Sequence, residues 1–180
     1  MARTETPQPT LGQTMPDFAL SPPGGAPVRL SEALGERGSV VAFICNHCPY
    51  VKAMAGRFAE DAAALAEAGV ATVAVMPNDW DAYPDDAPER MGAFAEAHGF
   101  GFPYLVDADQ SVARGWGAVC TPDLFGVGPD LALVYRGRLD DLGPREGAGD
   151  RRRELVEAMT AERRPSEPQH ASIGCSIKWR

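Results

Sequence analysis

The chain has 180 residues, of which 44% are apolar, and this is enough for one domain with its own hydrophobic core. A formal net charge of −8 repels phosphate backbones, so we expect no nucleic-acid partner. The most apolar runs, at 40–45 and 70–76, are too short to cross a bilayer, and the N-terminus lacks the apolar core of a signal peptide. We therefore expect a cytoplasmic protein without a membrane partner.

The first segments of the chain predict a tail, a hairpin and a strand. Residues 1–11 are polar and rich in proline and threonine, so we expect a flexible N-terminus there. Residues 15–20 and 28–30 are short extended segments on either side of a Pro-Pro-Gly-Gly turn, which predicts an N-terminal β-hairpin. The β-branched and aromatic run at 39–44 then predicts a strand that is buried on both faces.

Helices and strands alternate in the middle of the chain. Apolar residues three and four positions apart predict a helix over 51–65, and the run at 71–76 predicts a second buried strand. Asp86 and Glu89 have capping-box spacing, so a second helix should begin there and end at Gly99.

The last third of the chain completes a sheet. We expect a strand at 102–106 and a short helix at 111–115, followed by a hairpin whose strands are 123–127 and 131–136. Residues 151–162 predict a charged amphipathic helix. This order predicts an α/β fold in which helices flank a central mixed sheet.

The cysteine pair Cys45 and Cys48 is the strongest chemical signal. Pro49 lacks an amide proton and is tolerated only in the first turn of a helix, so the helix after Ile44 must have its N-cap between the two cysteines. Unpaired backbone amides at a helix N-terminus favour a thiolate, and a protonated His47 would add to this effect. One sulfur could then attack a disulfide while the other resolves the mixed disulfide.

Two other interpretations of the pair remain open. The cysteines could pack as small buried side chains, or they could form half of a zinc site that His170 and Cys175 complete. Such a module would be a non-catalytic zinc or redox sensor. The position of the pair between a strand and a helix favours redox chemistry, since structural zinc pairs usually occupy turns.

Four motifs are spread over the chain from residue 12 to its end. They are Met15-Pro16-Asp17-Phe18, the run Phe43–Lys52, Cys120-Thr121-Pro122-Asp123 and the run Gly174–Trp179. The set resembles the thioredoxin-like superfamily and, within it, a peroxiredoxin-like branch of the alkyl hydroperoxide reductase/thiol-specific antioxidant (redoxin) family.

This resemblance implies a thioredoxin-like domain at residues 12–163 and a C-terminal tail at 164–180 that docks back onto it. It also implies a cis peptide bond between Thr121 and Pro122, placed against the cysteines. In the superfamily this bond exposes the backbone of the preceding residue, so Thr121 and Pro122 would form a platform for an extended substrate.

The resemblance also implies a second activity, thiol-dependent peroxide reduction, with Cys48 as the peroxidatic cysteine. The peroxiredoxin signature is P-x-x-x-T-x-x-C, and here Val41 and Cys45 occupy its Pro and Thr positions. Thr121-Pro122 also occupies the stretch where those enzymes have an arginine. We therefore keep peroxide reduction as the alternative function.

The two remaining cysteines are candidate accessory thiols. Cys120 lies two residues before Pro122, so the fold should bring it near the redox pair, either as a thiol or as a buried small side chain. The tail around Cys175 becomes apolar again at Ile173, Ile177 and Trp179. It either places Cys175 as a resolving thiol near Cys48 or Cys120, or merely covers an apolar edge.

The leading interpretation is a thiol–disulfide oxidoreductase with an antioxidant role. Cys45 would attack, Cys48 would resolve, and His47 would adjust the thiol pKa. Substrates would be disulfides or hydroperoxides, and electrons would come from a thioredoxin- or glutathione-type donor. We expect no cofactor or metal, and a monomer or homodimer.

Overall fold

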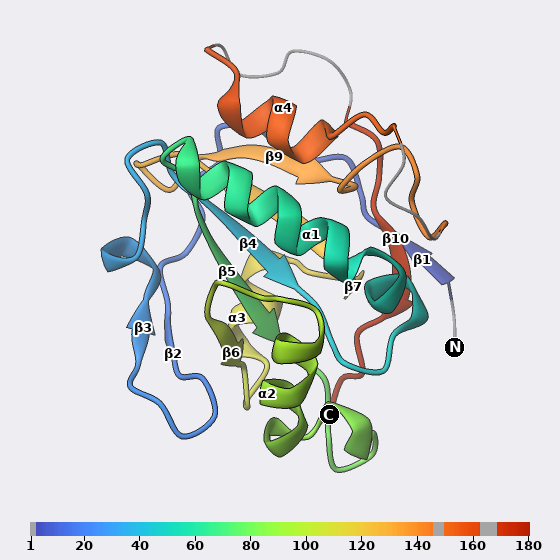
Figure 1. Cartoon of the computed structure of the whole chain (residues 1–180). Helices are drawn as coiled ribbons and strands as arrows, with labels where there is room; N and C mark the ends of the chain where they lie inside the picture. Colours follow the sequence, from blue (N-terminus) through green and yellow to red (C-terminus); the bar gives the residue numbers. More distant parts are fainter. Residues whose placement is uncertain (1–2, 146–149, 163–168) are drawn as a thin grey trace.

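The centre of the fold is a five-stranded mixed sheet in the order β6-β5-β4-β8-β9 (Figure 1). This computed structural model describes residues 3–145, 150–162 and 169–180. The sheet strands are β4 (Ser39–Phe43), β5 (Ala71–Met76), β6 (Tyr104–Val106), β8 (Asp123–Val127) and β9 (Leu133–Gly137). Strands β4, β5 and β6 are parallel, whereas β8 and β9 pair antiparallel. The prediction of a mixed sheet flanked by helices is confirmed.

Both faces of the sheet are covered, because alternate residues of β4 point to opposite sides. Val40 and Ala42 belong to one core cluster, and Val41 and Phe43 belong to another. Three helices pack against the first cluster: α1 (Pro49–Glu67), α2 (Pro88–Ala97) and α4 (Glu154–Thr160). The short helix α3 (Ser111–Trp116) packs against the second cluster. None of the helices in the described part of the chain could span a membrane.

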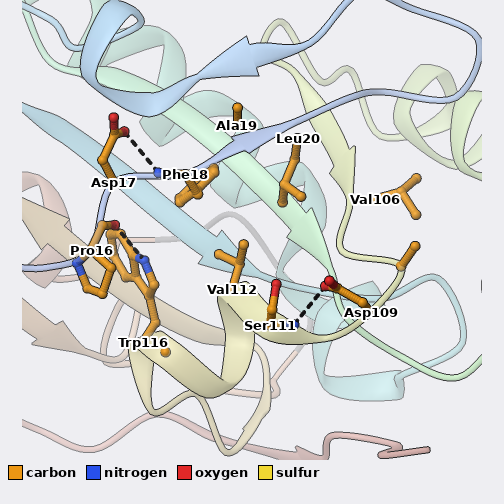
Figure 2. Close-up of a pocket in the computed structure, with 12 residues that line it drawn as sticks. Pro16, Asp17, Phe18, Ala19, Leu20, Val106, Asp109, Ser111, Val112 and Trp116 are labelled. Atoms are coloured by element: carbon orange, nitrogen blue, oxygen red, sulfur yellow. Dashed lines mark hydrogen bonds between the residues drawn. The ribbon is translucent and has the colours of Figure 1, made fainter.

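The predicted N-terminal hairpin is present as strands β2 (Ala19–Leu20) and β3 (Val28–Arg29). It leads into a short 3-10 helix, η1 (Leu30–Glu32). A hollow of about 560 Å³ lies between β2, the end of β6 and α3 (Figure 2). None of the residues that line this hollow hydrogen-bonds to the cysteine pair among the contacts that the structure describes.

A second sheet of three short strands joins the two ends of the chain. Strand β10 (Ile173–Ser176) lies between β1 (Arg3–Glu5) and β7 (Cys120–Thr121), antiparallel to both. The expectation of a flexible segment over residues 1–11 is therefore wrong for β1. The tail predicted at 164–180 lies against the domain from residue 169 onward, and 164–168 fall outside the described residues.

Two predicted helix starts are displaced in the structure. Helix α2 has Ala87 as its N-cap, whereas Asp86 belongs to a 3-10 turn, η2 (Pro84–Asp86), and is fully buried. Its carboxylate therefore serves another purpose than capping α2. The C-terminal helix begins at Glu154 rather than 151, and Arg151 and Arg153 before it are ion-pair partners of Asp61 in α1.

Candidate redox site

Both cysteines of the pair lie where a strand ends and a helix begins. Strand β4 ends at Phe43, and α1 begins at Pro49 with Cys48 as its N-cap. This is the arrangement that the proline predicted. Cys45 and Cys48 are reduced, and neither exposes any surface. A reagent in solution therefore cannot reach either sulfur unless a neighbouring segment moves.

Cys48 has the surroundings of a thiolate. As a thiol it donates to the carbonyl oxygen of Thr121 at 3.0 Å. A hydrogen bond from Cys45 is the largest influence, and it lowers the pKa of Cys48 to about 5 despite burial. The amides of Val51 and Cys175 also donate to this sulfur and lower its pKa further. Val51 is in the first turn of α1, so its amide has no partner within the helix.

Cys45 is held in its thiol form. Burial raises its pKa well above the ordinary value, and the hydrogen bond that it gives to Cys48 and the nearby charge of Asp86 raise it further. The hydroxyl of Thr121 is 3.2 Å from its sulfur and partly offsets these effects. These surroundings disagree with the sequence-based assignment of Cys45 as the attacking thiolate, because they place the negative charge on Cys48.

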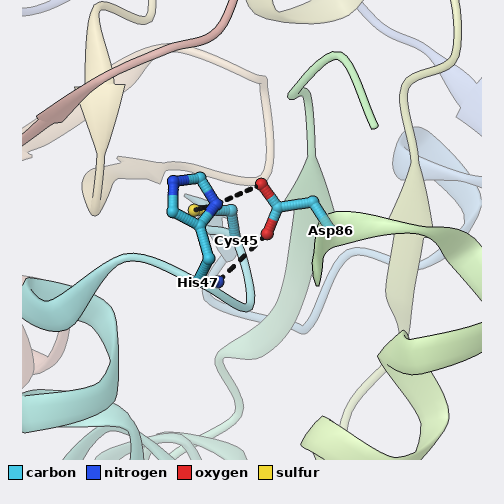
Figure 3. A group of neighbouring side chains, drawn as sticks. All are labelled: Cys45, His47 and Asp86. Carbon is cyan, nitrogen blue, oxygen red and sulfur yellow. Dashed lines mark hydrogen bonds and ion pairs between the residues drawn. The ribbon is translucent and has the colours of Figure 1, made fainter. Parts of the chain in front are cut away.

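Asp86 holds the loop that carries the cysteines, a role that sequence reasoning missed. One carboxylate oxygen accepts from the amides of Asn46 (2.8 Å) and His47 (3.0 Å), and the other from Asn78 Nδ2 (2.8 Å) and His47 Nδ1 (2.6 Å). Burial opposes its ionisation, yet the bonds from His47 and Asn78 hold the pKa of Asp86 below its usual value. The loop amides are thus bound to a buried negative charge (Figure 3).

The topology of the sheet contains the signal for Asp86. The parallel strands β4 and β5 end at the same edge, so the loops that follow them meet there. An acidic residue in the loop after β5 could therefore have been paired with the loop at 44–48. Asn46 was also missed. Its side chain accepts from Tyr104 Oη at 3.1 Å and donates to the Asp85 carbonyl oxygen at 3.0 Å.

His47 lies beside Cys45, as its sequence position suggests. Its Nδ1 atom is 3.8 Å from Cys45 Sγ, and its ring stacks on Tyr83 with the centroids 5.4 Å apart. The same Nδ1 atom faces the ionised carboxylate of Asp86, which can only accept, so Nδ1 must carry a proton. Because this proton is given to Asp86 at 2.6 Å, His47 Nδ1 neither donates to a Cys45 thiolate nor takes the Cys45 proton.

The Thr121–Pro122 peptide bond is cis, and Thr121 contacts both cysteines. Its hydroxyl reaches Cys45, and its carbonyl oxygen reaches Cys48. The neighbouring Cys120 is fully buried, and its sulfur lies 3.3 Å from the carbonyl oxygen of Pro122. Burial raises the pKa of Cys120, so this thiol stays protonated at neutral pH.

Cys175 lies next to Cys48, at the centre of β10. Its backbone is paired with Thr121, and both its amide and its thiol hydrogen-bond to the Cys48 sulfur. Burial and the contact with Cys48 raise the pKa of Cys175 to about 11. The structure therefore brings three sulfurs, those of Cys45, Cys48 and Cys175, to one place.

The zinc site considered from the sequence does not assemble around His170. Its Nδ1 atom lies 3.0 Å from Glu154 Oε2, and the ring is largely exposed. In the described residues the one group with metal-ligand geometry is Cys45, His47 and Asp86, whose candidate atoms lie within 4.8 Å of one another. His47 and Asp86 hydrogen-bond to each other, so two of these three candidate ligands already have a partner.

Solved structures identify the class of protein to which this architecture belongs. The chain is 40% identical to an uncharacterised conserved protein from Geobacillus kaustophilus, with a TM-score of 0.91 over 100% of this chain and 97% of that chain. It is also 40% identical to a Sinorhizobium meliloti protein, with a TM-score of 0.89 over 98% of both chains. The thioredoxin domain of a Bacteroides vulgatus thiol-disulfide oxidoreductase is 17% identical, with a TM-score of 0.59 over 71% of this chain and 87% of that chain. The fold is thioredoxin-like.

The sequence comparison gives the family. The pattern of the AhpC/TSA family matches residues 11–136, so the chain belongs to that family. A Mycobacterium tuberculosis protein provisionally named a peroxiredoxin is 29% identical over 123 residues, which cover 68% of this chain and 73% of that protein. Peroxiredoxin and thiol-disulfide oxidoreductase names among these relatives indicate oxidoreductase activity.

Proposed function

We propose that the chain is a thiol–disulfide oxidoreductase in which Cys48 is the attacking thiolate and Cys45 is the resolving thiol. The observation that carries this proposal is the position of Cys48 as the N-cap of α1, where the neighbouring Cys45 thiol and the Val51 amide lower the pKa of Cys48 to about 5. These donors stabilise one negative charge shared by two sulfurs, with Cys48 as the preferred site. The order of attack is the reverse of the one expected from the sequence.

The geometry supports a balanced sequence of two exchange steps. The Cys48 thiolate attacks a substrate disulfide, which forms a mixed disulfide and releases one substrate thiolate. Cys45 then gives its proton to the substrate thiolate released in the first step and attacks the Cys48 sulfur, so that a Cys45–Cys48 disulfide forms and the second substrate thiolate leaves. As Cys45 becomes an anion, the Thr121 hydroxyl can donate to it. Thr121 is thus a positioning residue for the second step, and His47 acts through its bond to Asp86, which holds the cysteine loop.

A thioredoxin- or glutathione-type thiol would regenerate the dithiol by attacking Cys48 and releasing Cys45. Trapping tests the order of attack. Because Cys175 also lies beside Cys48, both variants carry Cys175→Ser as well. The Cys45→Ser/Cys175→Ser variant should accumulate a mixed disulfide with glutathione at Cys48, whereas Cys48→Ser/Cys175→Ser should not accumulate one at Cys45. Mass mapping of the modified cysteine distinguishes the two. Stable adducts at Cys45 in the second variant, with none at Cys48 in the first, would contradict the proposal.

Peroxide reduction remains the second candidate, because a lowered pKa at Cys48 also suits a peroxidatic cysteine. Among the residues that the structure describes, the hydrogen-bond partners of the Cys48 sulfur are Cys45, Val51, Cys175 and Thr121. None of these is the arginine that would polarise a peroxide bond, and we therefore favour disulfide exchange. Rapid accumulation of Cys48 sulfenate in Cys45→Ser/Cys175→Ser under peroxide would reverse this order.

A further inference from the structure

Strand β10 is attached to β7 in the way that an extended peptide is added to the edge of a sheet. The register places Cys175 opposite Thr121 and Ser176 opposite Cys120. Without β10, the backbone of β7 next to the cysteine pair would be an unpaired strand edge. The last strand of the chain therefore occupies the one edge of β7 that lies beside Cys48.

The sulfur of Cys175 is placed where a substrate sulfur would have to be. Its thiol and its amide both hydrogen-bond to the Cys48 sulfur. Both groups come from the residue in register with Thr121, whose carbonyl oxygen is itself 3.0 Å from that sulfur. One strand thus supplies backbone pairing to β7 and a thiol to the attacking cysteine.

Gly174 is shaped for this close approach. A Cβ atom at residue 174 would clash with the carbonyl group of Thr121 and with Pro122 N. The clash would be with backbone atoms, which cannot move aside as a flexible side chain can. Any other residue would therefore hold β10 farther from the cis peptide bond and from Cys48.

The tail is also fixed on both sides of Cys175. The Ser172 hydroxyl donates to the Pro122 carbonyl oxygen at 2.9 Å, and Thr6 N donates to the Ser172 carbonyl oxygen at 3.0 Å. Beyond β10, Lys178 N donates to Asn78 Oδ1 at 2.9 Å and Ile177 is buried. These contacts hold β10, and with it Cys175, in place beside Cys48.

We infer that β10 is a built-in substrate strand, which keeps extended peptide disulfides away from β7 and exchanges disulfides with Cys48 through Cys175. In this exchange the Cys175 sulfur attacks the Cys48 sulfur of an oxidised Cys45–Cys48 pair. The Cys48–Cys175 bond forms, the Cys45–Cys48 bond breaks, and Cys45 leaves as a thiolate that takes the proton lost by Cys175. No electrons are gained or lost. This step rests on the proposed function, whereas the occupation of β7 does not.

Disulfide mapping tests the position of Cys175. Diamide, a two-electron oxidant that takes up the two thiol protons, should convert Cys45→Ser to a Cys48–Cys175 disulfide within one chain. The matched variant Cys48→Ser should leave Cys45 and Cys175 unlinked under the same treatment. Absence of the Cys48–Cys175 disulfide in folded Cys45→Ser would overturn the inference.

Displacing the strand tests its role as a cover. Gly174→Ala should raise the rate of Cys48 alkylation, and of exchange with a disulfide-containing peptide, by about tenfold or more, because the clash moves β10 outward. Gly101→Ala is the matched control, since a Cβ at Gly101 meets nothing within 4 Å. Equal rates in the two variants would contradict a covering role. If Gly174→Ala does not fold, the disulfide mapping alone decides.

The two proposals fail in distinguishable ways. If oxidised glutathione produces Cys48–Cys175 in the wild type but never Cys45–Cys48, the proposed exchange pair is wrong and the role of β10 stands. If only Cys45–Cys48 forms and Gly174→Ala changes no rate, the substrate-strand inference is wrong and the proposed function stands.

Discussion

Two sulfurs three positions apart have pKa values shifted in opposite directions because their surroundings differ. The Cys45 thiol and the Val51 amide lower the pKa of Cys48, whereas burial, the bond to Cys48 and the charge of Asp86 raise that of Cys45. In a buried site each such contact acts with little screening by water. Their positions in the sequence place both sulfurs at the N-terminus of the same helix, so sequence alone does not distinguish their pKa values.

The first prediction concerns the titration of Cys48. In the reduced wild type, ultraviolet thiolate absorbance should appear with a midpoint near the Cys48 pKa of about 5. In Cys45→Ala the midpoint should move up toward the ordinary thiol value of ~8.5, because the largest stabilising hydrogen bond is lost. Cys120→Ala should titrate as the wild type does. An unchanged midpoint in Cys45→Ala would show that the Cys45 thiol is not the main donor.

The same shift predicts how stability depends on pH. The folded-state pKa of Cys48 is depressed, so its stabilising contribution is complete above the unfolded value of ~8.5 and is lost as the pH falls through about 5. Between pH 8 and pH 5 the free energy of unfolding of the reduced protein should therefore decrease more steeply than that of Cys48→Ser. Urea titrations at several pH values measure the two slopes, and parallel slopes would contradict the assignment.

The carboxylate of Asp86 is the subject of a second residue-scale prediction. Asp86→Ala leaves the amides of Asn46 and His47 and the side chain of Asn78 without an acceptor, so we expect a loss of about 3 kcal/mol in the free energy of unfolding. It should also lower the pKa of Cys45, since the charge of Asp86 raises it. Asp85→Ala, at an exposed side chain, is the control for both readouts. Equal stabilities of the two variants would contradict this role.

At the scale of residues, the sequence predicted those features that depend on a single local rule. Pro49 predicted the position of both sulfurs, because the rule for proline in helices involves only neighbouring residues. The order of attack could not be predicted, since it depends on the burial of Cys45 and on a carboxylate forty positions away. Asp86 was wrongly predicted to cap a helix because its true partners, Asn46 and His47, are distant in the sequence.

At the scale of elements, α1 is joined to the start of α4 by buried ions. Asp61 of α1 accepts from Arg151 at 2.7 and 2.9 Å and from Arg153 at 2.6 Å, and its carboxylate is fully buried. Arg57, one turn earlier, binds Asp140 at 2.7 Å. This network fixes the helix whose N-terminus holds Cys48 against the segment that follows β9.

The third prediction follows from that network. Asp61→Ala leaves the buried guanidinium of Arg151 without its main partner, and we expect the free energy of unfolding to fall by about 3–5 kcal/mol. The neighbouring Glu60 is 63% exposed and 3.7 Å from the same arginine, so Glu60→Ala should cost less than about 1 kcal/mol. Chemical denaturation of both variants measures the difference. Similar losses would show that burial does not set the strength of this network.

Long elements with a clear apolar pattern were predicted close to their true bounds, including β4, β5, β8 and α1. Their pattern follows from the burial of their own residues. Strands β1 and β7 have three and two residues, and they exist only because β10 pairs with both. No local pattern records a partner that lies more than fifty positions away.

At the scale of the molecule, strands from the two ends of the chain pair with each other beside Thr121, which contacts Cys45 and Cys48. Strand β1 pairs with β10, and Thr4 lies opposite Gly174 (Figure 1). Arg180 adds ion pairs to Asp79 at 3.2 Å and Asp81 at 3.3 Å, in the loop after β5. Contacts from both ends of the described chain thus hold the tail that carries Cys175 in place.

The fourth prediction tests this cooperation between the termini. Removing residues 2–5 leaves one edge of β10 unpaired, so amide hydrogens in the 173–176 segment should exchange about tenfold faster than in the full chain. Segment 39–43 in the central sheet, which makes no contact with β1 through its ladder, is the internal control. Mass-spectrometric hydrogen exchange reports both segments. Unchanged exchange at 173–176 would show that β7 alone secures β10.

The late position of β10 in the sequence has a consequence for biosynthesis. Ribosomes add roughly 5–20 residues per second, so the segment with Cys45 and Cys48 is made several seconds before residues 173–176 exist. During those seconds the nascent chain has no strand with which to shield its reactive sulfur. We therefore expect Cys48 to react faster with thiol-modifying reagents in nascent chains in which residues 173–176 have not yet paired with β7.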